Sequence, residues 1–236
     1  MAKNYVNGHW VTPHRHLRAQ LLYAVSGVMQ ITTVVGSWIV PPNRAVWVPA
    51  NIGHDVRMSG DVAIRTLYVD PPRRARLPRL CTVVEVSPLL RELILALLDE
   101  PVAYDPKGRG GLIASLILRE LHTMAVAPLH LPIPDDSRLA RLCDSLIRRP
   151  NSEATLETLA AAAGASVRTI SRLFRSETGL SFRRWRQQAR LIEALKLLGG
   201  GESVGRVAEK VGYRSASAFS AMFRRALGRE PRHYFA

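Results

Sequence analysis

The sequence is poor in cysteine and has no long hydrophobic run. Two cysteines, Cys81 and Cys143, occur in 236 residues. Two thiols cannot form a disulfide framework or, alone, a four-ligand zinc site, so we expect buried free thiols in a reducing cytoplasm. No stretch approaches about 18 consecutive apolar residues, and the N-terminus lacks an apolar run. We therefore expect a cytoplasmic protein with no membrane span and no signal peptide.

Acidic residues are also scarce, at 19 Asp and Glu against 33 Lys and Arg, which gives a net charge of +14. This excess favours a polyanionic partner, either nucleic acid or an anionic membrane. It is uneven: residues 1–136 carry 14 basic and 11 acidic side chains, a net of +3, whereas residues 137–236 carry 19 and 8, a net of +11. The predicted polyanion-binding role therefore belongs to the C-terminal part.

Short strand-like runs dominate residues 1–86. The segment 20–33 contains two such runs broken near Ser26 and Gly27, and further runs occupy 45–48, 63–69 and 80–86. Turn-forming residues, including Ser-Gly-Asp at 59–61, separate them. This spacing predicts a β-barrel or β-sandwich.

The period changes to that of a helix over residues 87–126. One helix begins at Ser87-Pro88 and a second follows 105–111, each with leucine and isoleucine on one side. These apolar faces predict either packing onto the barrel or a dimerisation seam, and we favour the seam. The proline-rich segment 127–136 has neither period and predicts an extended linker between domains.

The remainder, 137–236, is predicted to be helical and to repeat itself. The expected helices are 137–149, 153–163, 166–178, 181–198, 203–211 and 215–227. Residues 159–164 match 207–212 at a shift of 48, and one inserted residue then aligns Phe174-Arg175 with Phe223-Arg224 and Gly179 with Gly228. Each unit is a helix, a glycine-containing turn and a second helix, which is the helix-turn-helix layout. A plain bundle with a solvated basic face is the alternative, and the repetition disfavours it.

These residues resemble the C-terminal DNA-binding domain of the AraC/XylS family of bacterial transcription regulators over the whole of 137–236. The run from Phe219 through Phe223-Arg224, Gly228 and Pro231 to Tyr234 is the most specific part of the match. The resemblance implies two helix-turn-helix units that enter successive major-groove segments of double-stranded promoter DNA, held by the helix 181–198. The predicted DNA-binding residues are Ser166, Arg168, Thr169, Ser171, Arg172, Arg175, Arg214, Ser215, Ser217, Ala218, Ser220, Arg224 and Arg232.

The two helix-turn-helix units are predicted to differ in how they contact DNA bases. The second helix of the first unit offers Arg168 and Arg172, which can reach guanine edges. The corresponding face of the second unit is nearly all alanine and serine, whereas family members often carry longer polar side chains there. The first unit is therefore predicted to supply most direct base readout. The second is predicted to hold the backbone and to contact thymine methyl groups.

A histidine motif lies in the first 30 residues. From Gly8 to Gly27 the sequence reads G-x5-H-x-H-x3-Q-x6-G, with His14, His16 and Gln20 at the named positions. It resembles the first motif of the cupin barrel, and the segment around His54 resembles the second. The resemblance implies that His14, His16 and His54 line one pocket, where three imidazoles and an oxygen ligand suit a first-row divalent metal.

Gln20, however, stands where the cupin pattern has an acidic ligand, and Asn43, Asn51 and Met58 also depart from the second motif. A neutral amide is a poorer metal ligand than a carboxylate. The sequence therefore predicts either a weakly held divalent metal or a vestigial pocket in which the histidines bind water or a polar effector.

Taken together, the sequence predicts an α+β protein with a cupin-like sensor barrel at 1–86, a helical pair at 87–126, a linker at 127–136 and a two-unit DNA-binding domain at 137–236. We expect a regulator that is not an enzyme, forms a homodimer, has RNA polymerase as a candidate partner and does not bind membranes. A cupin metalloenzyme with a basic helical appendage is the alternative. The absent acidic ligand and the doubled helix-turn-helix argue against it.

Overall fold

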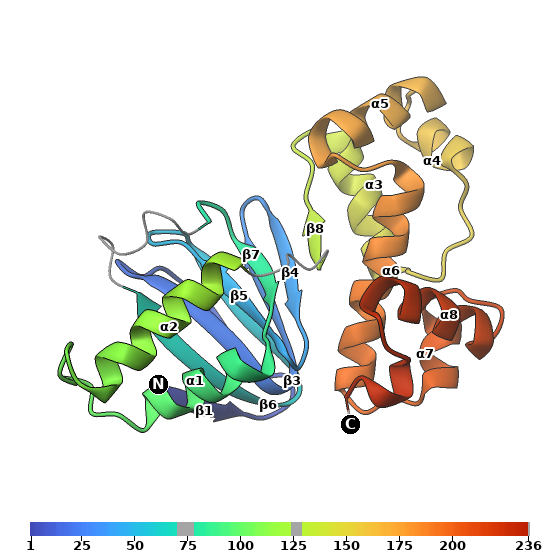
Figure 1. The fold of residues 1–236 in the computed structure, drawn as a ribbon. Helices are drawn as coiled ribbons and strands as arrows, with labels where there is room; N and C mark the ends of the chain where they lie inside the picture. Colours follow the sequence, from blue (N-terminus) through green and yellow to red (C-terminus); the bar gives the residue numbers. More distant parts are fainter. Residues whose placement is uncertain (70–77, 124–128, 236) are drawn as a thin grey trace. The chain divides into compact units, whose positions relative to one another are not determined.

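The computed structural model describes residues 1–69, 78–123 and 129–235 (Figure 1). The chain forms two compact units. The first contains Met1–Thr33 and Trp38–Leu129, and the second contains Val34–Ser37 and His130–Ala236.

A largely antiparallel eight-stranded sheet dominates the N-terminal part. Its strands are β1 (Ala2–Tyr5), β2 (Trp10–His14), β3 (Ala19–Thr33), β4 (Gly36–Val40), β5 (Arg44–Val48), β6 (His54–Val69), β7 (Thr82–Glu85) and β8 (His130–Pro132). The main order is β1-β6-β3-β4-β8, while β2 also pairs with β6, and β5 pairs with both β3 and β7. The sheet is strongly curved in Figure 1. These strands confirm the predicted β class of this part.

The two longest strands correct the predicted breaks. The β3 strand runs through Ser26 and Gly27, with shifts of register against β6 on both sides of Ser26. The β6 strand likewise continues through the predicted turn at 59–61. Gly27 and Gly60 have φ of 68° and 76°, a conformation that glycine adopts without the steric cost of a Cβ. Glycine at these positions therefore produces irregularities within continuous strands instead of turns.

Helices α1 (Pro88–Leu98) and α2 (Arg109–Thr123) cover one face of the sheet, as Figure 1 shows. The Ser87 hydroxyl accepts a hydrogen bond from the Leu90 amide and begins α1, as the Ser-Pro pair predicts. The core between helices and sheet contains Leu21, Tyr23, Trp47, Val84, Leu90, Ile94, Ile113, Ile117 and Leu121. Much of the apolar surface of the two helices is thus used in this core, and the exposed part is smaller than the sequence suggested.

The C-terminal unit is helical. It contains α3 (Ser137–Arg148), α4 (Leu156–Ala162), α5 (Val167–Thr178), α6 (Phe182–Gly199), α7 (Val204–Lys210), α8 (Ala216–Leu227) and a final 3-10 turn, η2 (Pro231–His233). The helices agree with the predicted ones to within a few residues at each end. Phe174, Trp185, Phe219 and Phe223 are fully buried and form the centres of its core.

The structure differs from the predicted linker at 127–136. Residues 127 and 128 lie outside the described residues, and His130–Pro132 forms strand β8 instead of an unpaired spacer. The Trp185 indole N–H donates to the Pro132 carbonyl at 3.0 Å, and the Gln188 amide donates to the His130 carbonyl. These bonds attach the segment to α6. A strand of three residues within a proline-rich segment is too short to show the alternating pattern that would predict strand pairing.

The glycines of the two repeated turns offer a matched test of the fold. Gly164 and Gly212 have φ of 63° and 76°. A Cβ at Gly164 meets nothing within 4 Å, whereas one at Gly212 lies 2.7 Å from Arg190 Nη2 and 2.9 Å from the Asn151 Cα. We expect Gly164→Ala to lower the free energy of unfolding by about 1–2 kcal/mol through backbone strain alone, and Gly212→Ala to lower it further. Urea unfolding followed by circular dichroism at 222 nm measures both, and equal losses would contradict the crowding at Gly212.

Candidate DNA-binding interface and histidine site

Two helix-turn-helix units with the same local geometry lie in the C-terminal unit. The first consists of α4 and α5, and the second of α7 and α8. After α4 the Ala165 amide donates to the Ala160 carbonyl at 3.0 Å, and after α7 the Tyr213 amide donates to the Ala208 carbonyl at 2.8 Å. Both pairs obey the shift of 48 residues found in the sequence. The repeat is therefore a repeat of backbone conformation as well.

The second helix of each unit begins and ends in the same way. The hydroxyls of Ser166 and Ser215 each accept a hydrogen bond at 3.1 Å, from the amides of Thr169 and Ala218. The glycines that end α5 and α8, Gly179 and Gly228, have φ of 69° and 77°. Serine caps and left-handed glycine ends are the standard signals for helix termini. They fix the length of the two candidate recognition helices.

The outward face of α5 presents arginine. Ile170 and Phe174 are fully buried, while Arg168, Arg172 and Arg175 are exposed. Ser171 and Thr169 are half-buried. The Thr169 hydroxyl lies 2.9 Å from the Ser166 hydroxyl, so these two predicted DNA contacts are hydrogen-bonded to each other in the cap. The exposed guanidinium groups are consequently the side chains of α5 with free reach toward a major groove.

The outward face of α8 carries mostly short side chains. Arg214, Ser215, Ser217, Ala218, Arg224 and Arg232 are exposed and Ser220 is half-buried. Four of them, Ser217, Ser220, Arg224 and Arg232, line one hollow together with Ala216 and Ala221. The nearest carboxylate, Glu230, lies 3.9 Å from the Arg224 guanidinium. The structure thus brings four of the seven predicted residues of the second unit together, on a surface with small side chains and two arginines.

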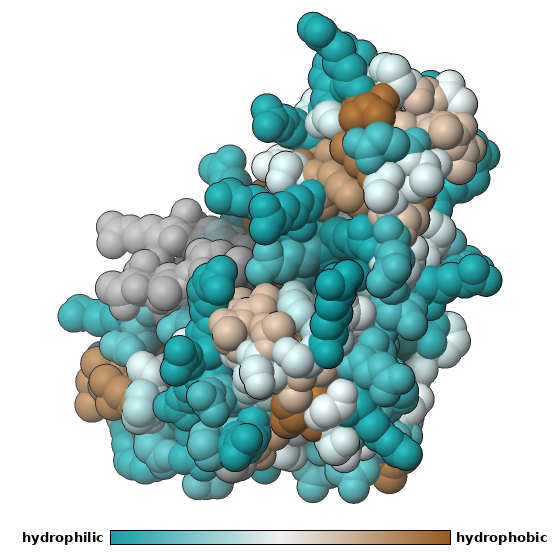
Figure 2. All heavy atoms as spheres, turned by 90° about the vertical axis from the view of Figure 1, so that its right-hand side faces the viewer, coloured by the Kyte–Doolittle hydropathy of each residue, from teal (hydrophilic) through white to brown (hydrophobic). Residues whose placement is uncertain are grey.

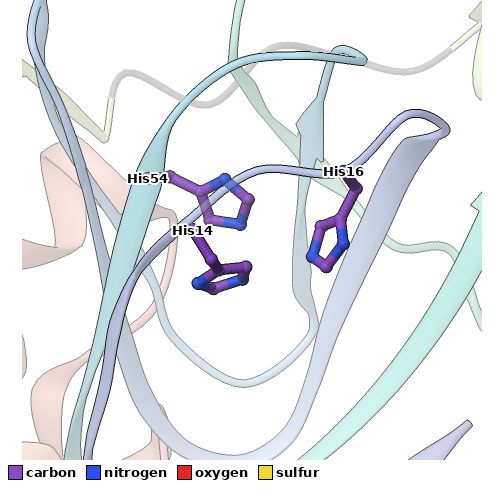
Figure 3. A group of neighbouring side chains, drawn as sticks. All are labelled: His14, His16 and His54. Carbon is purple, nitrogen blue, oxygen red and sulfur yellow. The ribbon is translucent and has the colours of Figure 1, made fainter.

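Three histidines meet in the N-terminal unit, as the sequence predicts. His14 ends β2 and pairs in register with His54 at the start of β6, and His16 follows two residues after His14. Their ring centroids lie 4.4–5.7 Å apart, and one ligand atom from each ring lies within 4.8 Å of the others. Figure 3 shows the three imidazoles gathered inside the curve of the sheet. Among the described residues, this is the one group of three or more His, Cys, Asp or Glu side chains close enough to share a metal ion.

Backbone carbonyls orient two of the rings. His14 Nδ1 lies 2.7 Å from the Thr12 carbonyl oxygen, and His54 Nδ1 lies 3.0 Å from the Ile52 carbonyl oxygen. A carbonyl accepts only from a protonated nitrogen, so Nε2 of each neutral ring carries the lone pair. The buried Nε2 atoms of His54 and His16 have no hydrogen-bond partner in the described structure. Lone pairs are therefore available at the site.

The protonation equilibrium favours the same state. Burial lowers the pKa of the His54 imidazole, and the neighbouring histidines lower it further. Burial and the charge of His14 lower the pKa of the His16 imidazole. Since the ordinary value is about 6.5, both rings are neutral at pH 7 and able to accept a cation.

Gln20 is linked to this group through Tyr68, a residue that the motif did not indicate. Its side chain is 4% exposed, its Nε2 donates to the Tyr68 hydroxyl at 3.4 Å, and its Oε1 is buried with no partner. The Tyr68 ring packs edge-on against the His16 ring at 5.3 Å. Tyr68 lies opposite Gln20 in the β3–β6 register, a relation that no local pattern could reveal.

The donor set fits a divalent metal with a small rearrangement. Imidazole nitrogens lie about 2.0–2.1 Å from zinc, so two nitrogens on one ion are closer together than 4.8 Å. The rings must move inward by about 1 Å to bind one ion. The Gln20 amide, which stands where the cupin pattern has an acidic ligand, offers only a neutral oxygen, and such an oxygen suits a metal site less well than a carboxylate.

No helix in the described residues is long and apolar enough to cross a membrane. Figure 2 shows a face on which long hydrophilic side chains project and hydrophobic patches are small and separate.

Comparisons with known proteins give matches to both parts of the chain. Residues 159–236 match a family model described as a helix-turn-helix domain, and residues 3–122 match one described as an AraC-like ligand binding domain. The HTH-type transcriptional regulator NimR of Escherichia coli is 33% identical over 223 residues, which are 94% of this chain and 81% of that protein. The transcriptional activator NphR of a Rhodococcus species is 36% identical over 124 residues, 52% of this chain and 36% of that protein.

Solved structures give matches of low overall similarity. The DNA-binding domain of AdpA in complex with a target DNA is 38% identical, with a TM-score of 0.39 over 41% of this chain and 88% of that one. Fatty-acid-bound ToxT of Vibrio cholerae is 11% identical, with a TM-score of 0.42 over 99% of this chain and 93% of that one. The family matches and the NimR relationship decide the question: the chain belongs to the AraC family of DNA-binding transcription regulators, with an N-terminal ligand-binding domain, and is not an enzyme.

Proposed function

We propose that this regulator binds a promoter operator through α5 and α8, and that a divalent metal at His14, His16, His54 and Gln20 controls this binding. The observation that supports the effector site best is a set of buried, unpartnered acceptor atoms: Nε2 of His16, Nε2 of His54 and Oε1 of Gln20. Buried polar groups are almost always hydrogen-bonded, so a concentration of unpaired acceptors points to a cation or donor that pairs them.

Metal binding is best tested by element analysis of the purified protein and by calorimetric titration with Zn²⁺ and Co²⁺. Removing an outer partner of a metal ligand costs roughly 10–100-fold in affinity, so His54→Gln, which removes a ligand, should cost at least that. His9→Gln is the matched control, because His9 is exposed and outside the group. Equal affinities of the two variants would rule out the metal. If the site binds a polar organic molecule instead of a metal, the affinity for that molecule should still differ between the same two variants.

The bound metal should be released by acid over a defined range. Protons compete with the metal for the imidazole nitrogens. Because the pKa values of His16 and His54 lie below the ordinary value, the apparent metal affinity should remain nearly constant from pH 7.5 to about 6.5 and fall below that. Titrations at pH 7.5, 6.5 and 5.5 measure this. A decline already complete at pH 7 would contradict neutral, buried imidazoles.

Base readout is proposed to reside mainly in α5. Arg168 and Arg172 are exposed on it, whereas Ser217 and Ala221 occupy the aligned positions of α8. In the second unit, Ser215, Ser217, Arg224 and Arg232 would hold phosphates, with alanine methyl groups against thymine. Fragments selected by the protein from random DNA would give the operator, and the absence of any selected sequence would overturn the proposed function.

We expect Arg172→Ala to weaken binding to the selected operator by about 1–3 kcal/mol and to relax the preference at one base pair, if Arg172 pairs with a guanine. Ser217→Ala should weaken binding less and leave the preferred sequence unchanged. Selection repeated with each variant, beside an Arg141→Ala control on α3, measures both effects. Stronger preferences opposite α8 than opposite α5 would contradict this assignment.

We propose that the active form is a homodimer joined through α2, with RNA polymerase as a candidate partner at the promoter. Leu112 and Leu116 are 65% and 48% exposed and one helical turn apart, although the other side of α2 packs on the sheet. Two protomers would require two half-sites in the operator.

If this face joins protomers, Leu112→Glu with Leu116→Glu should convert a dimer to a monomer in sedimentation velocity. Each change places a charge where the partner's apolar surface would lie. Val6→Glu alters another exposed apolar residue, outside the helical pair, and should leave the mass unchanged. A wild-type protein that sediments as a monomer would refute the dimer.

A further inference from the structure

A cleft of about 710 Å³ lies within the helical unit, between α6, α8 and the loop that precedes α4. Five arginines and one carboxylate line it: Arg183, Arg186, Arg190, Arg214, Arg225 and Glu153. Of these residues, only Arg214 is among the predicted DNA contacts.

The floor of the cleft is rigid. Arg190 donates to the carbonyls of Pro150 at 2.9 Å, Ser152 at 3.3 Å and Gly212 at 3.4 Å. Arg186 donates through Nη1 to the Ala154 carbonyl at 2.8 Å, while its Nε is buried with no partner in the described structure. These two residues therefore contribute fixed positive charge, and Arg186 retains an unused donor.

The cations at the rim of the cleft are not neutralised by acidic side chains. Arg183, Arg214 and Arg225 are exposed, and in the described part of the chain none of them forms an ion pair. Burial and, second, the charge of the neighbouring Arg190 lower the pKa of Arg186, while Glu153 acts in the opposite direction. Five like charges with one opposing carboxylate favour binding of an anion.

The position of the cleft indicates which anion. Ala218 and Arg214, at the start of α8, belong both to the cleft and to the proposed DNA-facing surface. The cleft also lies beside α6, the helix that joins the two helix-turn-helix units. When two helices enter successive major-groove segments, the stretch of protein between them faces the sugar-phosphate backbone that borders the intervening minor groove.

We infer that this arginine cleft binds backbone phosphate of the DNA, with Arg183 and Arg225 as the contacting cations and Arg186 and Arg190 as fixed charges behind them. The inference rests on the proposed function, since it requires DNA to lie along α5 and α8. Phosphate contacts carry no base information. The cleft therefore adds affinity and register, and it does so beside the unit whose recognition helix has small side chains.

The test compares the Arg183→Ala/Arg225→Ala double variant with an Arg141→Ala/Arg148→Ala control, which removes two exposed charges from α3. Affinity of the full chain for a random 30-base-pair duplex and for the selected operator is measured between 50 and 200 mM salt. Each phosphate contact contributes about 0.9 to the slope of log K against log salt. Losing two contacts should flatten the slope by about 1.8, so the affinity ratio of wild type to variant should fall roughly tenfold over this range.

The inference predicts a flattened slope on both duplexes for the cleft variant alone, with the ratio of operator to random affinity retained. Equal slopes for the two double variants would overturn it, while retained operator preference would leave the proposed function intact. Loss of all operator preference in the wild type would instead refute the proposed function.

A second measurement separates DNA phosphate from a free anion. If 10 mM inorganic phosphate raises the Tm of the wild type but not of the cleft variant, and the salt slopes are equal, the cleft binds a small anion and the DNA assignment is wrong. Circular dichroism at 222 nm confirms that both variants retain the helical fold.

Discussion

The arrangement of the DNA-binding unit depends on the guanidinium of Arg190. It projects from α6 and donates to carbonyls of the loop before the first helix-turn-helix, at Pro150 and Ser152, and to the Gly212 carbonyl in the turn of the second. One cation thereby links both helix-turn-helix units by hydrogen bonds to α6, the helix between them. Burying a charge is costly unless its hydrogen bonds are made, and the carbonyl oxygens make them here. A fixed separation of α5 and α8 is what two successive major-groove segments require.

Much of this unit was predictable from the sequence, although the Arg190 interaction was not. Helix caps, turn glycines and apolar periodicity are local signals, and they placed Ser166, Ser215, Gly179 and Gly228 at the helix termini where the structure has them. The contacts of Arg190 span 22 to 40 residues and join a side chain to main-chain carbonyls. Such contacts have no composition or spacing that marks them. The sequence shows only that this part of the chain is basic, so the cleft could not be predicted from it.

The sheet shows the opposite balance. The histidine motif identified the residues that meet, because His14 and His16 are close in the chain and His54 carries a second motif. It did not show that β6 continues through 59–61, nor that β1, β2 and β4 exist. The β1 and β2 strands lie outside the buried core and are mainly polar or exposed, so alternation of apolar and polar residues is weak there. Tyr68 reaches Gln20 only through strand pairing, which is set by register across 48 residues.

The two proposed kinds of DNA contact should respond differently to solution conditions, because one depends on hydrogen bonds to bases and the other on phosphate charge. Guanidinium groups on α5 can form bidentate bonds with bases, and these bonds distinguish sequences. The cations near α8 and in the cleft are proposed to contact phosphates, and the contribution of such contacts falls steeply as salt rises because counterion release then gains less free energy. Increasing salt should therefore weaken the second unit's hold first and leave discrimination dependent on α5. On this proposal, the +11 charge of this part of the chain serves two separate functions, base recognition at Arg168 and Arg172 and phosphate binding elsewhere.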